Sequence, residues 1–130
     1  MMQEKILIIE DDKFLLKLYS GKLRREGFEV LESLRGKEGL SKIFTEKPDL
    51  VILDLILPDM NGFEVLSEIK LNPKTKNIPV IILTNLGQQS DIRKGLELGA
   101  AAYLVKAEFF IEQLPILVKE NLAKIKRKPR

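Results

Sequence analysis

The 130-residue sequence contains no cysteine and no histidine. Without cysteine there are no disulfides and no thiol chemistry, and without histidine as well a zinc ion lacks its usual ligands. No apolar run approaches the roughly 20 residues that span a bilayer. The first residues reach the apolar stretch through Gln3, Glu4 and Lys5, which is not the pattern of a signal peptide. We therefore expect a cytoplasmic protein with no membrane partner.

The composition is that of one soluble domain, with 45% hydrophobic and 32% charged residues. The net charge is only +3, and the basic residues crowd one end. Five lie within the last seven positions: Lys124, Lys126, Arg127, Lys128 and Arg130. We interpret this run as a solvated helix end or linker rather than a nucleic-acid site. The prediction is a domain over 1–125 and a basic tail over 126–130.

Five strand-like segments alternate with helical patterns, at 5–10, 28–33, 50–54, 79–84 and 101–105. The second segment alternates only partly between apolar and polar residues, so we expect it to be an edge strand of the sheet. Apolar residues between the strands recur at helical spacing. They are Leu15, Leu18, Tyr19 and Leu23, then Phe63, Leu66 and Ile69, and later Leu114, Val118, Leu122 and Ile125. This alternation predicts an α/β fold, a (βα)₅ unit with a parallel sheet and right-handed crossovers.

Acidic residues follow two of these strands. Glu10, Asp11 and Asp12 come directly after an apolar run, and Asp54 ends another run 43 residues beyond Asp11 (54 − 11). The carboxyl ends of parallel strands share one edge of the sheet, where ligands bind. Converging carboxylates repel one another unless a cation joins them, and oxygen ligands alone suit Mg²⁺. The pattern predicts a divalent metal beside a reactive aspartate.

Two further polar residues follow apolar strands, Thr84 and Lys106. A pocket with carboxylates, a hydroxyl and an ammonium suits phosphoryl transfer to a carboxylate. Asp54 is then the nucleophile, and Asp11 with Asp54 holds Mg²⁺, which Glu10 reaches through water. Lys106 and Thr84 are the expected donors to phosphoryl oxygens. The plainer alternative is that residues 10–12 cap the first helix.

The chain resembles the receiver domains of two-component response regulators, such as the chemotaxis regulators, over about Lys5 to Ile125. The resemblance lies in IIEDD, DLVILDLILPDMNGFEVL, IPVIILT and AAYLVKA. The family pattern DxxLPxxxG is present as Asp54, Leu57, Pro58 and Gly62. The resemblance implies a flavodoxin-like three-layer sandwich, whose five-stranded parallel sheet has the order 2-1-3-4-5.

The resemblance also implies a function. A histidine kinase, a phosphotransfer protein or a small phosphodonor would phosphorylate Asp54 with Mg²⁺, or with Mn²⁺ in its place. Glu10 and Asp11 match the family's acid pair, and the main-chain carbonyl of Ile56 matches a further metal ligand. The protein would be a phosphorylated signalling switch with self-dephosphorylation, and not a turnover enzyme.

Thr84 and Tyr103 match the family's switch pair, in which the hydroxyl moves to the phosphoryl group and the ring turns inward. The output surface is then formed by the fourth helix, fifth strand and fifth helix. It would bind a downstream protein target, as a monomer or a phosphorylation-dependent dimer. The region of Phe14, Leu15 and Leu18 matches the family's kinase-docking helix, although we expect most of these side chains to face the sheet.

The sequence departs from the family at Ala107, where proline usually follows the lysine, so we expect Lys106 to be less rigidly aimed. Asn85 stands where a small residue is common, which predicts altered access to the phosphoryl group. Ile56 and Leu86 flank the expected water path, and neither can orient a water. We therefore predict slow self-dephosphorylation.

Three other functions fit the composition less well. A haloacid dehalogenase-like phosphatase needs a DxD motif after the first strand and a cap insertion, for which there is no room here. A flavodoxin-like flavin carrier needs a hydroxyl-rich phosphate loop where this chain has acids. A receiver-like domain that binds partners without phosphorylation would not need Asp54, Thr84 and Lys106 together.

Overall fold

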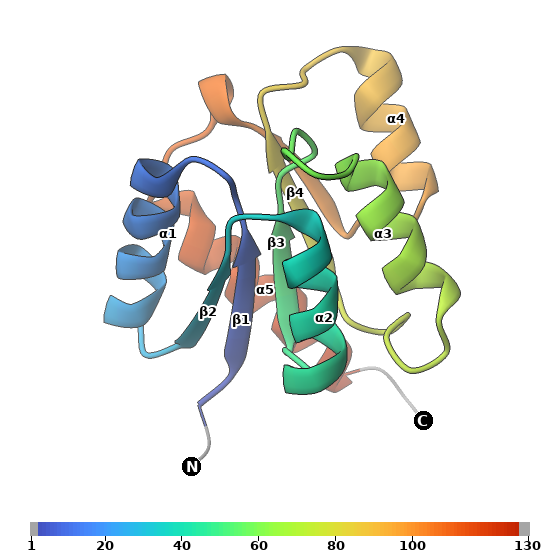
Figure 1. Cartoon of the computed structure of the whole chain (residues 1–130). Coiled ribbons are helices and arrows are strands. Elements are labelled where there is room, and N and C mark those ends of the chain that lie inside the picture. Colours follow the sequence, from blue (N-terminus) through green and yellow to red (C-terminus); the bar gives the residue numbers. More distant parts are fainter. Residues whose placement is uncertain (1–2, 128–130) are drawn as a thin grey trace.

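The computed structural model, which describes residues 3–127, is a five-stranded parallel sheet with helices on both faces (Figure 1). The strand order is β2-β1-β3-β4-β5, as expected. The strands are β1 (Lys5–Ile9), β2 (Glu29–Ser33), β3 (Leu50–Leu53), β4 (Val80–Thr84) and β5 (Ala102–Val105). The helices are α1 (Lys13–Arg25), α2 (Gly36–Glu46), α3 (Gly62–Leu71), α4 (Gln89–Glu97), a short 3₁₀ turn η1 (Lys106–Glu108) and α5 (Gln113–Arg127).

Two apolar cores lie on opposite faces of the sheet. Alternate side chains of β1 point to opposite faces, so Ile6 and Ile8 pack with α1 and α5, whereas Leu7 and Ile9 pack with α2 and α3. All four are fully buried. A strand covered on both faces needs apolar residues at every position, which explains the unbroken apolar runs. In Figure 1, α2 lies in front of the sheet and α5 behind it.

The predicted strands are confirmed to within one residue at each end, and β2 is an edge strand as expected. Pro115 lies in the first turn of α5, where a missing N–H costs nothing. α5 continues to Arg127, so the first two positions of the predicted tail are helical, and 128–130 lie outside the described residues. No helix in the described part of the chain combines the length and apolarity that crossing a membrane requires.

The apolar faces expected for the first and last helices are partly wrong. Leu18 and Ile125 are 41% and 43% exposed, and Leu16 is buried in α1 instead. The expectation that most of Phe14, Leu15 and Leu18 face the sheet is also wrong, since Phe14 is 74% exposed and only Leu15 packs against the core. Three-to-four spacing allows two adjacent faces in a short helix, and the crossing of α1 over the sheet selects one of them.

The register of the central strands positions the polar residues that follow them. Ile9 of β1 lies opposite Leu53 of β3, and the amide of Asp54 donates to the carbonyl of Ile9 at 3.0 Å. On the other side, Thr84 of β4 lies opposite Val105 of β5. The residues after these strands therefore lie along one edge of the sheet.

Candidate metal centre

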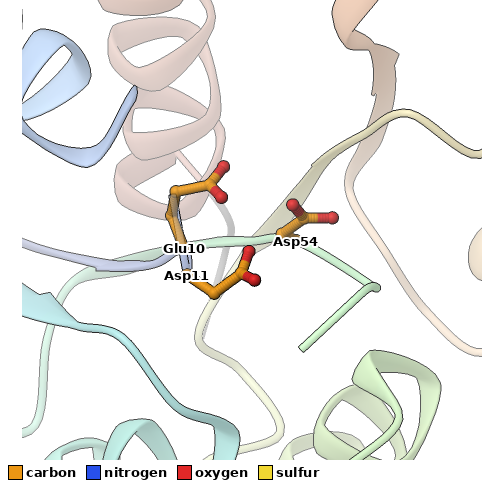
Figure 2. A group of neighbouring side chains, drawn as sticks. All are labelled: Glu10, Asp11 and Asp54. Atoms are coloured by element: carbon orange, nitrogen blue, oxygen red, sulfur yellow. The ribbon is translucent and has the colours of Figure 1, made fainter. Parts of the chain in front are cut away.

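Three carboxyl groups converge at the carboxyl ends of β1 and β3 (Figure 2). Glu10, Asp11 and Asp54 each place a carboxylate oxygen within 4.8 Å of the others. Glu10 and Asp54 are 2% and 4% exposed, whereas Asp11 is open to solvent. The predicted acid cluster is thus brought together, with two members inside the protein and one at its surface.

Lys106 follows β5 and reaches into this cluster. Its Nζ lies 2.7 Å from Glu10 Oε1 and 2.7 Å from Asp54 Oδ2, with only 10% of the side chain exposed. Burial lowers the pKa of Lys106, but the hydrogen bonds to Asp54 and Glu10 outweigh it and raise the pKa above its ordinary value. Ala107 in place of proline therefore does not take the amine away from the pocket.

Glu10 shows that one amine does not satisfy this cluster. Burial raises the pKa of Glu10 to about 7. The hydrogen bonds from Lys106 and from the Asp12 amide, at 3.0 Å, lower it only in part, and the charge of Asp54 raises it further. A further cation would favour the ionised form. The donors are all oxygens, which suits Mg²⁺ or Mn²⁺.

Asp54 is held by hydrogen bonds at both carboxylate oxygens. Its Oδ2 accepts from Lys106, and its Oδ1 accepts from the amide of Ile56 at 3.1 Å. The side chain of Ile56 is half exposed, and Ile56 pairs with Asn61 in an isolated bridge. The main chain that offers a candidate metal carbonyl is thus held against the candidate phosphoacceptor.

Asp12 does not belong to the cluster. Its side chain is the N-cap of α1 and accepts from the amide of Leu15 at 3.0 Å. The capping interpretation is right for Asp12, while Glu10 and Asp11 turn to Asp54.

Thr84 and Tyr103 meet on one residue of the β4–α4 loop. The buried Thr84 hydroxyl accepts from the amide of Leu86 at 3.4 Å, and the Tyr103 hydroxyl donates to the carbonyl of Leu86 at 2.6 Å. Burial, with the charges of Asp91 and Asp54, raises the pKa of Tyr103 to about 12. Among the described hydrogen bonds of Thr84, none reaches Asp54.

Sequence reasoning missed Asp59. This residue lies in the loop after Asp54, and its carboxylate accepts from the amides of Gly36 at 2.7 Å and Lys37 at 2.9 Å, at the start of α2. The only signal in the sequence is an acid in the LPDMNG segment and the absence of a capping side chain at Arg35.

The sequence matches one protein family and several of its curated members. The family model described as the response regulator receiver domain matches residues 6–117. The phosphate regulon regulatory protein PhoB of Rhizobium meliloti is 38% identical over 96% of this chain and 55% of its own length. The transcriptional regulator RpaA of Synechocystis is 36% identical over 97% of this chain and 52% of its own. The chain thus spans about half the length of such curated relatives.

Solved structures of receiver domains share this fold. A CheY-like receiver domain from Methanospirillum hungatei superposes with a TM-score of 0.89 at 32% identity, over 98% of this chain and all of its own. A BeF₃-activated DrrB receiver domain does so with a TM-score of 0.81 at 37% identity, over 94% of this chain and 99% of its own.

Proposed function

The chain belongs to the response regulator receiver domain family, and we propose that it accepts a phosphoryl group on Asp54 from a histidine kinase or phosphotransfer protein. Domains of this family are signalling switches. The observation that carries the proposal is the cluster in which Lys106 reaches Asp54 at 2.7 Å beside Glu10 and Asp11. A carboxylate, a cation and oxygen ligands for a metal are the parts that phosphoryl transfer needs.

The transfer begins with attack by a carboxylate oxygen of Asp54 on the phosphorus of a phosphohistidine. A P–O bond forms to Asp54 while the P–N bond to the imidazole breaks, and the leaving nitrogen keeps the electron pair and is protonated by solvent. Lys106 donates to one phosphoryl oxygen, and the Thr84 hydroxyl turns from Leu86 to donate to another.

Glu10, Asp11, Asp54 and the main-chain carbonyl of Ile56 would hold Mg²⁺ or Mn²⁺. When bound, the ion neutralises charge on the phosphoryl oxygens. The surrounding residues position the amine and the ligands. Glu10 is buried and holds Lys106 beside Asp54, while Asp11 is the exposed member of the cluster.

The switch would act through Leu86. Thr84 and Tyr103 both bond to this residue, so a Thr84 hydroxyl drawn to the phosphoryl group releases one of its two contacts. The β4–α4 loop, to which the Tyr103 hydroxyl is bonded through the Leu86 carbonyl, then rearranges. Such a local change in charge can bias a two-state element and alter a protein-binding surface at α4, β5 and α5.

The kinase or phosphotransfer partner would dock on exposed apolar residues near the cluster. Phe14 is 74% exposed on α1, Leu18 is 41% exposed one turn further along, and Phe110 is 71% exposed between η1 and α5. Both elements follow strand ends that carry the cluster, so a partner bound there would bring its phosphohistidine toward Asp54.

Intact-mass measurement after incubation with acetyl phosphate tests the proposal. We expect a Mg²⁺-dependent gain of one phosphoryl group, which Asp54→Asn abolishes because the amide is not a nucleophile. Asp49→Asn is the matched control, since Asp49 is an exposed aspartate that caps the Lys5 amide at the opposite edge of the sheet. Full labelling of Asp54→Asn would show that Asp54 is not the phosphoacceptor.

The same labelled protein separates a switch from a phosphatase. Ile56 and Leu86 offer no side-chain group to orient an attacking water, so the label should persist for longer than about a minute after the donor is removed. Rapid turnover of generic phosphoesters would favour a phosphatase instead.

A further inference from the structure

The segment 54–62, which we call the acceptor loop, is fixed from within at both ends. At its start the amide of Ile56 donates to Asp54 Oδ1 at 3.1 Å. At its end the amide of Gly62 donates to the carbonyl of Leu55 at 2.9 Å. The start of the loop is also bonded to the end of β1, because the Asp54 amide donates to the Ile9 carbonyl at 3.0 Å, but none of these bonds reaches the outer turn at 57–60.

The outer turn of the acceptor loop is anchored to α2. The two oxygens of Asp59 accept from Gly36 at 2.7 Å and Lys37 at 2.9 Å, so one carboxylate satisfies two free amides at the helix start. The residue at the N-cap position, Arg35, provides no side-chain cap of its own. The hydrogen bond from the Lys37 amide, together with that from Gly36, holds the pKa of Asp59 below its ordinary value despite some burial.

Side-chain packing strengthens this anchor. Met60 lies against Gly36, where a Cβ atom would clash with it. α2 is in turn seated on β1, because Gly39 lies against the side chain of Ile9, the residue before Glu10. The acceptor loop and the end of β1 therefore rest on the same helix.

We propose that Asp59 is a positioning residue that holds the Ile56 carbonyl in register with Asp11 and Asp54 by fastening the acceptor loop to α2. The inference rests on the proposed metal role of that carbonyl. Two charge-assisted hydrogen bonds, from the adjacent amides of Gly36 and Lys37, join the loop to α2 through this one carboxylate. Its loss leaves both ends of the loop bonded as before but frees the outer turn to move away from α2.

Calorimetric titration with Mg²⁺ alone tests the proposal. Asp59→Ala loses both bonds, and we expect its Mg²⁺ dissociation constant to rise about tenfold, the usual scale for residues that orient metal ligands. Asp59→Asn keeps one acceptor oxygen, so its Mg²⁺ dissociation constant should lie between those of the wild type and Asp59→Ala. Asp49→Asn loses a comparable carboxylate–amide bond, that to Lys5 at 2.7 Å, and should bind Mg²⁺ as the wild type does.

A double variant separates positioning from mere helix capping. Adding Arg35→Ser to Asp59→Ala gives α2 a local cap and should restore the stability of the helix, but it cannot reach the acceptor loop. We expect the urea midpoint to recover while Mg²⁺ binding stays weak. If Mg²⁺ affinity recovers together with stability, Asp59 is only a cap and the inference is wrong.

The controls also distinguish this inference from the proposed function. A wild-type chain that takes up no Mg²⁺ overturns both. A wild-type chain that binds Mg²⁺, with Asp59→Ala and Asp59→Asn binding equally well, overturns the inference alone.

Discussion

The negative charge of the three carboxyl groups in the cluster is only partly balanced by the Lys106 amine. Three carboxyl groups share one amine, and Lys106 can contact only Glu10 and Asp54. Burial disfavours the ionised form of a carboxyl group, and it raises the pKa of Glu10 even though Lys106 is bonded to it. The site is therefore prepared for a second cation, and its affinity for one should depend on pH.

Magnesium affinity is expected to fall as pH drops through about 7. The pKa of Glu10 is raised in the folded chain from 4.5 to about 7, so protonation of Glu10 stabilises the metal-free fold and its ionisation on raising the pH costs stability. A bound cation favours the ionised form, so Mg²⁺ must displace a proton below pH 7. One linked proton predicts roughly tenfold weaker binding at pH 6 than at pH 8.

Calorimetry at pH 6, 7 and 8 measures this dependence. Glu10→Gln should bind Mg²⁺ more weakly at pH 8 and lose most of the pH dependence. Equal affinity of the wild type at pH 6 and pH 8 would show that Glu10 does not control the site.

At the scale of elements, the backbone at the start of α3 packs directly against the backbone of the acceptor loop. Gly62 opens α3, and a Cβ atom there would lie 2.6 Å from the carbonyl oxygen of Asp54 and closer still to the Cα of Leu55. Both obstacles are backbone, so they cannot swing aside as a side-chain tip can. The glycine is required for the loop to return to close contact with the backbone of Asp54 and Leu55.

Gly62→Ala is expected to destabilise the fold by about 1–3 kcal/mol, the cost of overpacking at a rigid contact. Gly21→Ala is the matched control, because Gly21 also lies in a helix and its added Cβ would meet only the tip of Arg25 at 3.4 Å. That variant should be neutral or stabilised by up to about 1 kcal/mol through helix propensity. Urea unfolding compares the two. Equal midpoints would contradict the close-approach argument.

At the scale of the whole molecule, the sheet is most deeply buried at its centre. Every residue of β3 and β4 is buried, whereas every residue of β5 is only half-buried. Stability is distributed in the same way, since strands with few buried contacts open before the core does. β5 carries Tyr103 and precedes Lys106, so we expect the sheet edge next to the cluster to be the more easily opened one.

Native-state hydrogen exchange should reveal this gradient. Amides of β3 are expected to exchange only through global unfolding, while those of β5 exchange through a smaller opening with a lower free energy. The dependence of exchange on denaturant, measured by NMR, separates the two. If β5 amides open only with the whole fold, the edge is not an independent unit.

Much of the fold was predictable because the strands of a doubly covered sheet are apolar at every position. That property marked four of the five strands, the half-alternating pattern marked β2, and the acids after β1 and β3 marked the acid cluster. The helix faces were less predictable. Three-to-four spacing fits neighbouring faces of α1 almost equally well, and it led to Leu18 where the fold buries Leu16.

The sequence by itself determined which residues end strands, because local apolar runs and the polar residues after them need no partner to be recognised. The shared sheet edge predicted that these residues lie near one another, and only the tertiary structure decided which of them bond to each other. Lys106 reaches Asp54 across 52 positions, and Asp59 reaches Gly36 across 23. No local pattern encodes such pairs. They depend on the position of β5 within the sheet and on how α2 packs against the sheet, which is settled by the packing of the two cores.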